Sequence, residues 1–156
     1  MSRAGIGYDI HRLAADRRLV LGGVAIEHPM GLVGHSDGDV LLHALMDALL
    51  GAANLGDLGR HFPSDDPAYA GARSLDLART VGGLVRERGF TVSSLDATVI
   101  AQAPRLAPHV QAMREAIAKA LEVGIDRVSV KATTNDGLGV VGAGEAIAAI
   151  AIAQLE

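Results

Sequence analysis

The chain has 156 residues, the size of one domain with a substantial hydrophobic core. Hydrophobic residues make up 49% and charged residues 21%, while the net charge of −4 and the aromatic content of 3% argue against nucleic-acid binding. The absence of cysteine excludes disulfides and thiolate ligands, so a bound metal must use histidine nitrogen and carboxylate oxygen. Without a signal-peptide core or a membrane-spanning run, we expect a cytoplasmic protein with a single domain over residues 1–156.

The first expected element is a short strand over residues 1–8, which ends at Asp9, Ile10 and His11. Side chains two apart in a strand face the same way, so Asp9 and His11 should point together while Ile10 points to the core. This pair suits two ligands of one metal ion. The alternative, which alternation alone favours, is a pair of polar side chains at the solvent-facing end of a strand.

A hairpin, a polar loop and a helix follow. Two short apolar runs around a Gly-Gly pair predict a β-hairpin over residues 17–26. The polar loop of residues 34–39 then leads into an apolar helix over residues 39–53, with Asp39 as its N-cap. Polar side chains and free N–H groups at a helix start suit anion binding, and a plain turn before a capped helix is the alternative.

His43 lies one turn into this helix and Asp47 lies one turn further on. Residues four apart share a helix face, so Asp47 either orients the His43 ring for metal binding or forms a plain surface pair with it. Together with Asp9 and His11, His43 would provide three nitrogen and oxygen ligands. Such a set leaves the fourth position of a tetrahedral zinc site open, as in catalytic zinc sites.

The rest of the chain alternates helices and strands. Helices are expected over residues 74–88 and 108–121, strands over 91–101 and 125–133, and either a helix or a buried strand over 146–153. The polar loop of residues 56–67 is long enough to be functional or mobile. The turn at residues 134–139 is suited to a phosphate or a second, oxygen-liganded cation. The interleaved elements predict a layered sheet covered by helices.

Several motifs match a known family. They are GYDIH at residues 7–11, HSDGD at 35–39 with His43, DALLGA at 47–52, LGDLG at 55–59, AQAPR at 101–105 and KATT at 131–134. On these motifs the chain resembles the 2-C-methyl-D-erythritol 2,4-cyclodiphosphate synthase family over nearly its whole length. The combination of Asp-x-His with HSDGD and His43 is highly specific, whereas no single fragment would be.

The resemblance implies an α+β fold in which helices cover one face of a mixed sheet, with the sheets packed around the three-fold axis of a homotrimer. It implies a lyase of non-mevalonate isoprenoid synthesis that converts 4-diphosphocytidyl-2-C-methyl-D-erythritol 2-phosphate to the 2,4-cyclodiphosphate and releases CMP. The 2-phosphate would attack the β-phosphorus within one molecule. The sites would lie between subunits, and neither nucleic acid nor a membrane would be a partner.

The resemblance also implies residue roles. Asp9, His11 and His43 would hold one Zn²⁺ per chain, and His35 and Thr134 would stabilise the transition state. The implied substrate-binding residues are Ser36, Asp57, Leu58, Gly59, Phe62, Pro63, Ser64, Asp65, Asp66, Ala101, Gln102, Ala103, Pro104, Arg105, Leu106, Ala107, Lys131, Thr133, Asn135 and Asp136.

The chain departs from the family pattern at a few positions. Asp136 replaces the glutamate that contacts Mg²⁺ or Mn²⁺ on the substrate diphosphate, so a bridging water or a shifted ion would be needed. Ser64 replaces a carboxylate. Val140 and Ala143 replace a phenylalanine and an arginine, which leaves isoprenoid diphosphate binding in the central cavity of the trimer open. A metal-dependent phosphohydrolase and a non-catalytic diphosphate-binding trimer remain alternative functions.

Overall fold

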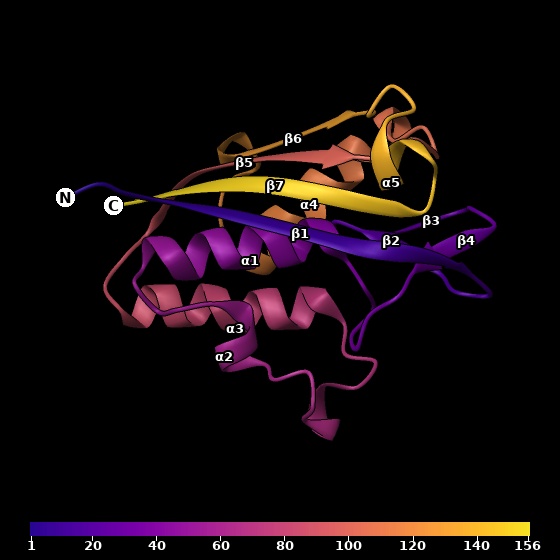
Figure 1. Ribbon diagram of the computed structural model, residues 1–156. Helices are drawn as coiled ribbons and strands as arrows, with labels where there is room; N and C mark the ends of the chain where they lie inside the picture. Colours follow the sequence, from indigo (N-terminus) through magenta and orange to yellow (C-terminus); the bar gives the residue numbers. More distant parts are fainter.

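A computed structural model describes all of residues 1–156, and its central feature is a five-stranded mixed sheet (Figure 1). In spatial order the strands are β4 (Met30–Leu32), β1 (Arg3–Ala15), β7 (Ala146–Leu155), β5 (Val92–Ile100) and β6 (Val128–Thr133). β1 runs antiparallel to β4 and β7, β5 is antiparallel to β7, and β5 and β6 are parallel. A separate hairpin pairs β2 (Leu19–Leu21) with β3 (Val24–Ile26), as the Gly-Gly pair predicts.

The long helices, α1 (Val40–Ala52), α3 (Ser74–Glu87) and α4 (Val110–Leu121), lie on one side of this sheet. α1 packs against β1 and β7, α4 packs against β6, and α3 contacts both α1 and α4. Short helical segments occupy the connections, namely α2 (Leu58–His61), η1 (Pro67–Tyr69), η2 (Ala107–His109), η3 (Ile125–Arg127) and α5 (Gly139–Gly142). The predicted α+β architecture is confirmed. None of the helices has the length and apolar character that crossing a membrane requires.

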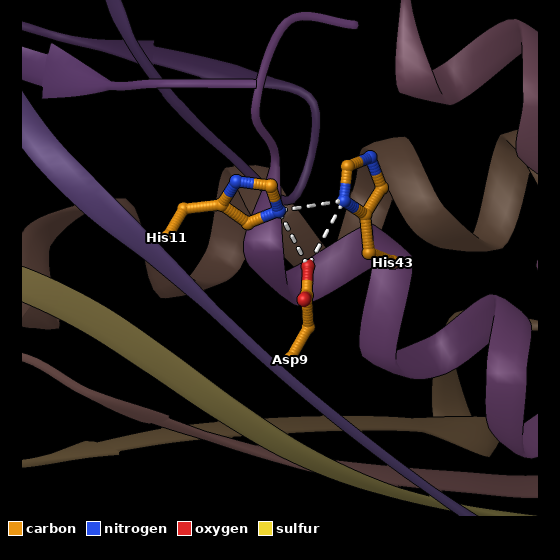
Figure 2. Close-up of side chains that lie close together, drawn as sticks. All are labelled: Asp9, His11 and His43. Atoms are coloured by element: carbon orange, nitrogen blue, oxygen red, sulfur yellow. Dashed lines mark hydrogen bonds and ion pairs between the residues drawn. The ribbon is translucent and has the colours of Figure 1, made fainter. Parts of the chain in front are cut away.

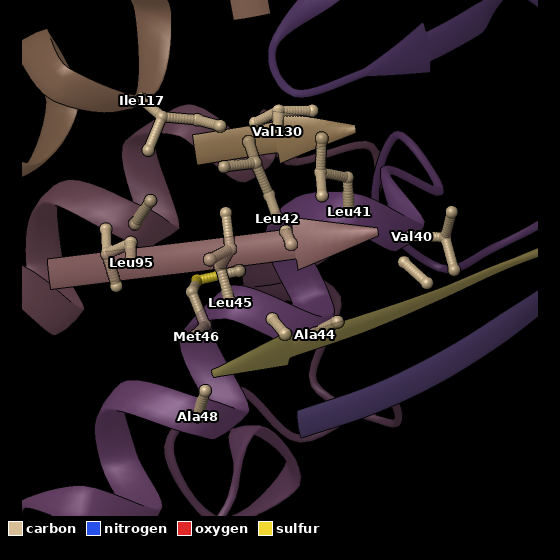
Figure 3. Close-up of a cluster of buried hydrophobic side chains, with 14 of the residues drawn as sticks. Val40, Leu41, Leu42, Ala44, Leu45, Met46, Ala48, Leu95, Ile117 and Val130 are labelled. Carbon is tan, nitrogen blue, oxygen red and sulfur yellow. The ribbon is translucent and has the colours of Figure 1, made fainter. Parts of the chain in front are cut away.

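Nearly every side chain of α1 is buried, because the helix lies between the sheet and α3. Leu42, Leu45 and Met46 of α1 meet Leu95 of β5 and Val130 of β6 in the main hydrophobic core (Figure 3). This burial on all sides explains why the sequence of α1 is apolar nearly throughout rather than along one stripe.

Asp39 fixes the start of α1, as the N-cap prediction requires. Its Oδ1 accepts a hydrogen bond from the N–H of Leu42 at 3.1 Å. The same carboxylate accepts from the N–H groups of Gly22 at 2.9 Å and Gly23 at 2.7 Å. Asp39 is fully buried, so one carboxylate joins the hairpin turn of β2 and β3 to the first turn of α1.

β1 approaches α1 closely because glycine occupies the facing positions of the strand. A Cβ atom on Gly7 would lie 1.9 Å from the carbonyl oxygen of Ala44, and one on Gly5 would lie 2.1 Å from that of Ala48. No side chain fits at either distance. The close approach places Asp9, the next residue on this side of β1, beside α1.

The opposite face of the sheet is open and apolar along β1 and β7. Its exposed large side chains are Ile6, Tyr8, Ile10, Ile150 and Ile152. The prediction that Ile10 points to the core is therefore wrong for the single chain, in which 39% of Ile10 is exposed. The helices cover the side of β1 that carries Asp9 and His11, and strand alternation sends Ile10 the other way.

Several predicted boundaries shift. β1 continues to Ala15 instead of ending at residues 9–11, because it pairs with β7 as far as Arg12 and then with β4. Residues 125–127 form a single 3₁₀ turn before β6 rather than part of the strand. The ambiguous segment of residues 146–153 belongs to β7, which pairs on both edges, and its alanines allow α1 to pack closely.

Candidate active site

The side chains of Asp9, His11 and His43 converge on one point (Figure 2). Asp9 Oδ2 lies 2.8 Å from His11 Nε2 and 3.0 Å from His43 Nδ1, and these two ring nitrogens are 3.2 Å apart. β1 supplies the first two residues from its helix-facing side, and α1 supplies His43, which is only 8% exposed. The structure therefore brings together the three residues that the sequence suggested as metal ligands.

The outward ring nitrogens of both histidines have partners. His11 Nδ1 lies 2.6 Å from the carbonyl oxygen of Val33, so this nitrogen carries a proton and donates it. His43 Nε2 lies within hydrogen-bond distance of two hydroxyl groups, those of Ser36 and Ser74. Neutral His11 would therefore direct a lone pair at the carboxylate of Asp9. A positive charge, either a proton or a metal ion, is needed between them.

The pKa shifts of Asp9 and His11 agree with the need for a positive charge between them. Burial tends to raise the pKa of Asp9, but hydrogen bonds with His11 and His43 outweigh burial and lower the pKa to about 2. The hydrogen bond with Asp9 raises the pKa of His11 above its ordinary value of 6.5, against the opposing effect of burial. A divalent cation would supply the same positive charge once His11 has lost its proton.

The donor set fits zinc. Ligand atoms at zinc bond lengths of about 2.0–2.1 Å are about 3.3 Å apart in a tetrahedron. The observed separations of 2.8, 3.0 and 3.2 Å are slightly shorter, so small side-chain movements would accommodate an ion. The cluster contains no fourth histidine or carboxylate. One coordination position would therefore remain for water or a substrate oxygen.

A pocket of about 220 Å³ lies beside the cluster and includes His11 and His43 in its wall. Its other lining residues are His35, Ser36, Leu58, Gly59, Phe62, Ser64, Tyr69 and Leu77. Predicted substrate residues from the loop before α1 and from the loop around α2 thus meet next to the candidate metal ligands. The predicted residues Pro63, Asp65 and Asp66 belong to the same loop but do not line the pocket.

Hydrogen bonds hold the loops that form this pocket. His35 Nε2 lies 3.0 Å from the carbonyl oxygen of Asp66, which joins the two loops. Asp57 caps α2 through a 3.0 Å hydrogen bond from the N–H of Arg60 to Oδ1. The side chain of Asp66 accepts from the N–H of Ala68 at 2.9 Å and so caps η1. Both carboxylates therefore serve the local backbone.

Asp47 positions α2 rather than the His43 ring. Its Oδ1 accepts a 2.7 Å hydrogen bond from the N–H of Leu58, the first residue of α2. Burial raises the pKa of Asp47, and the hydrogen bond from Leu58 opposes that shift. The hydrogen-bond partners of the outward nitrogen of His43 are Ser36 and Ser74.

A second pocket, of about 320 Å³, gathers the other predicted substrate residues. It is lined by Ala101, Gln102, Ala103, Pro104, Arg105, Leu106, Ala107, Ala132, Thr133 and Thr134. It shares no lining residue with the pocket beside the metal cluster. Within one chain, the two halves of the predicted site therefore form separate pockets.

The turn after β6 carries Asn135 and Asp136. Thr134 Oγ1 donates to Asp136 Oδ1 at 3.3 Å and accepts from the Asp136 N–H at 3.2 Å. The N–H of Gly137 donates to Oε1 of Gln102 at 3.2 Å, which ties this turn to the second pocket. The turn predicted for residues 134–139 is thus formed, with its carboxylate exposed beside the second pocket.

Lys131 lies elsewhere. Its side chain is on the open face of the sheet, where Nζ lies 2.7 Å from both carboxylate oxygens of Asp96. It lines neither of the two pockets that contain the other predicted residues. Substrate binding by Lys131 stays a prediction.

Some residues at the site were missed by sequence reasoning. Tyr69 and Leu77 line the first pocket, and Tyr69 packs edge-on against Phe62 with ring centroids 5.2 Å apart. Ser74 reaches His43 from the start of α3. A serine at a predicted helix start is a signal for a local hydrogen bond, but it does not reveal a partner 31 residues away.

Comparison with known proteins identifies the family. A model of the YgbB family matches residues 2–156. The chain belongs to the YgbB family. Proteins from Alkaliphilus oremlandii and Trichlorobacter lovleyi, both called 2-C-methyl-D-erythritol 2,4-cyclodiphosphate synthase, are 57% and 58% identical to it over 153 residues. Each alignment covers 98% of this chain and 98% of the relative.

The fold comparison agrees. A solved structure of 2C-methyl-D-erythritol-2,4-cyclodiphosphate synthase in a CDP-bound form has a TM-score of 0.90 and 37% identity to this chain. The superposition covers 99% of this chain and 100% of that one. The family resemblance predicted from the motifs is confirmed, and both pockets lie within the shared fold.

Proposed function

We propose that this protein is a phosphorus–oxygen lyase that converts 4-diphosphocytidyl-2-C-methyl-D-erythritol 2-phosphate to 2-C-methyl-D-erythritol 2,4-cyclodiphosphate, in line with the names of its relatives. An oxygen of the 2-phosphate attacks the β-phosphorus, and a new phosphorus–oxygen bond forms. The bond from the β-phosphorus to the phosphate oxygen of CMP breaks, and CMP leaves. The observation that carries the proposal is the convergence of Asp9, His11 and His43 beside a pocket in a chain of this family.

The nucleophile is already an anion, so the protein needs no strong general base. Its tasks are to hold the two phosphates in line and to neutralise their crowded charge. Positioning of this kind contributes about 7–11 kcal/mol to an intramolecular attack. Asp9, His11 and His43 would hold one Zn²⁺, which would polarise a phosphate oxygen when bound.

His35 and Ser36 are assigned to the phosphate that reacts. Both line the pocket that contains His11 and His43, so a phosphate held there would reach all of these groups. The His35 imidazole, fixed through Nε2 near the carbonyl oxygen of Asp66, would stabilise charge in the transition state. Ser36 would bind the methylerythritol phosphate portion through its hydroxyl.

The cytidine phosphate portion is assigned to the second pocket, formed by residues 101–107 and 132–134. Two related structures are CDP complexes, which supports this ligand class. Because the two pockets share no residue in one chain, a complete site would take one pocket from each of two neighbouring subunits. Thr134 of the second pocket would then complete the transition-state contacts.

A homotrimer with sites between subunits is the assembly that we propose. The open apolar face of β1 and β7 supports it, because an exposed apolar face of this kind is typical of an interface. Asp136 is assigned to a Mg²⁺ or Mn²⁺ ion that accompanies the substrate diphosphate. Its carboxylate would hold the ion, and the positive charge of the ion would stabilise the negative charge on the leaving CMP.

The reaction is tested by incubating the purified protein and the cytidine substrate with Zn²⁺ and Mg²⁺. CMP and one cyclic product should appear in the ³¹P NMR spectrum. Inorganic phosphate or linear phosphates would instead identify a metal-dependent phosphohydrolase. Substrate binding without turnover would identify a non-catalytic diphosphate-binding trimer.

The metal site is tested by elemental analysis. The wild-type protein should contain about one zinc per chain. His11→Ala should lose the zinc, and His43→Ala should lose both the zinc and the release of CMP. A wild-type protein prepared with zinc that retains none after dialysis would contradict the site.

A further inference from the structure

A series of hydrogen bonds leads from the candidate metal cluster to Ser74, the first residue of α3, and from there to the half-buried Asp37. His43 directs Nδ1 at Asp9 and His11, and its other nitrogen, Nε2, lies 3.0 Å from Oγ of Ser74. Ser74 Oγ donates to Asp37 Oδ1 at 2.5 Å, and the backbone N–H of Ser74 donates to Asp37 Oδ2 at 2.9 Å. Asp37 therefore binds the first residue of α3 with both carboxylate oxygens.

The number of available protons determines which atom donates in each of these hydrogen bonds. A carboxylate accepts hydrogen bonds only, so the single hydroxyl proton of Ser74 points to Asp37. Toward His43, Ser74 Oγ can then only accept, and Nε2 must carry the proton of the ring. In the neutral imidazole that would bind a metal, Nδ1 therefore has no proton to donate to Asp9, and its lone pair points to the place where the metal would bind.

Ser36 does not impose this arrangement. Its Oγ is 3.1 Å from His43 Nε2 and accepts a 3.3 Å hydrogen bond from the N–H of Gly38. No acceptor fixes the position of the Ser36 proton, so the Ser36 hydroxyl by itself would not determine which nitrogen of His43 is protonated. Ser36 also lines the pocket, whereas Ser74 is fully buried. The Ser36 hydroxyl is thus free to turn toward a ligand.

We propose that Ser74 and Asp37 are positioning residues that fix the metal-binding tautomer and the orientation of His43. The inference rests on the proposed metal site and adds two residues to it. Hydrogen-bond partners of metal-bound histidines hold the ring in place and raise its basicity, and their loss typically weakens metal binding 10- to 100-fold.

The same residues join the metal cluster to the loop of His35. The backbone N–H of Asp37 donates to the carbonyl oxygen of Ala72 at 3.0 Å, and the N–H of Gly71 donates to that of His35 at 2.8 Å. The loop before α1 and the segment that starts α3 are therefore one hydrogen-bonded unit. A change at Ser74 or Asp37 acts on His43 and on the backbone that carries His35.

Zinc affinity tests the proposal directly. Each purified full-length variant is titrated with Zn²⁺ against a chromophoric chelator, and its Co²⁺ form is examined by visible absorption spectroscopy. Ser74→Ala should bind zinc about 10- to 100-fold more weakly and change the Co²⁺ spectrum. Ser74→Thr, which keeps the hydroxyl, and Ser36→Ala, which removes the other one, should both stay within about 3-fold of wild type.

Other outcomes decide against the proposal. If Ser74→Ala binds zinc as tightly as wild type, or if Ser36→Ala loses as much affinity, Ser74 does not position His43. Should Ser74→Ala fail to fold, Asp37→Asn decides, because it leaves Ser74 in place and removes the charge that holds its proton. Its zinc affinity should fall about 3- to 10-fold, and unchanged affinity in a folded Asp37→Asn protein would contradict the proposal. A wild-type protein that binds no zinc would overturn the metal site itself.

Discussion

Asp9 Oδ2 lies 3.0 Å from His43 Nδ1, although the two residues are 34 positions apart and belong to β1 and α1. This contact depends on the close packing of the strand on the helix. Gly7, two residues before Asp9, lies so close to the carbonyl oxygen of Ala44 that a Cβ atom would not fit between them. The geometry of the metal cluster is therefore set by strand–helix packing as well as by the ligands.

Gly7→Ala should disturb both stability and metal binding. The added Cβ would lie 1.9 Å from the Ala44 oxygen, so β1 must move away from α1. We expect the free energy of unfolding to fall by about 3 kcal/mol in urea titrations, together with weaker zinc binding. Gly51→Ala is the matched control. Gly51 belongs to α1, and a Cβ atom added there would have no other group within 4 Å. It should stabilise the protein by about 0.5–1 kcal/mol.

The metal-free protein should show a stability maximum in mildly acidic solution. Asp9, whose pKa is lowered from 3.8 to about 2, stabilises the fold above pH 3.8 and loses this effect as the pH falls toward 2. His11, whose pKa is raised, stabilises the fold fully below pH 6.5 and loses this effect as the pH rises through its raised pKa. Their joint contribution is greatest between these limits.

Thermal unfolding in the presence of a chelator measures this effect. The melting temperature of the wild-type protein should fall by about 3–6 °C as the pH rises from 6 to 9. Asp9→Asn should flatten this part of the curve, since it removes the partner that raises the pKa of His11. With Zn²⁺ present the trend should reverse, because zinc replaces the His11 proton and binds more tightly as the pH rises. If the melting temperatures of the metal-free wild-type and Asp9→Asn proteins fall equally steeply with pH, Asp9 does not raise the pKa of His11.

Asp47→Ala should separate the role that the structure shows for this residue, holding the start of α2, from the orientation of His43 that the sequence allowed. The variant loses the hydrogen bond from Leu58 that holds the start of α2 in the pocket wall. We expect KM for the cytidine substrate to rise about 5- to 10-fold, with zinc content unchanged. Loss of zinc at an unaltered KM would instead show that Asp47 acts on His43.

Ile152→Glu should prevent assembly. Ile152 is half exposed on the open face of β7, and a carboxylate there would be buried without a partner between subunits. Light scattering coupled to gel filtration should give a trimer for wild type and a monomer for the variant. Thr80→Glu, on the exposed surface of α3, is the control and should remain trimeric. A trimeric Ile152→Glu protein would place the interface elsewhere.

Local sequence patterns were sufficient to predict several strands and helix starts and the chemistry of the metal ligands. The alternation of Leu95, Ala97 and Val99 predicted β5, and Asp39 before an apolar run predicted the capped start of α1. The metal ligands were suggested by residue chemistry and by the family motifs. These features depend on neighbours in the chain or on donor type, and both can be read from the sequence.

Other features required the tertiary structure. Sequence patterns could not assign residues 146–153, because the strand identity of β7 comes from pairing with β1 and β5 on both edges. Ile10 was misplaced because alternation separates two faces but does not say which face the helices cover.

The family, the donor types of the metal site and the start of the helix that carries His43 could all be predicted before the fold was known. Three relationships came from the folded structure: Asp9, His11 and His43 converge, Asp47 binds the start of α2, and Ser74 links His43 to Asp37. Each of these contacts joins segments far apart in the chain. Their distances depend on how β1, α1 and α3 pack, which no local pattern encodes.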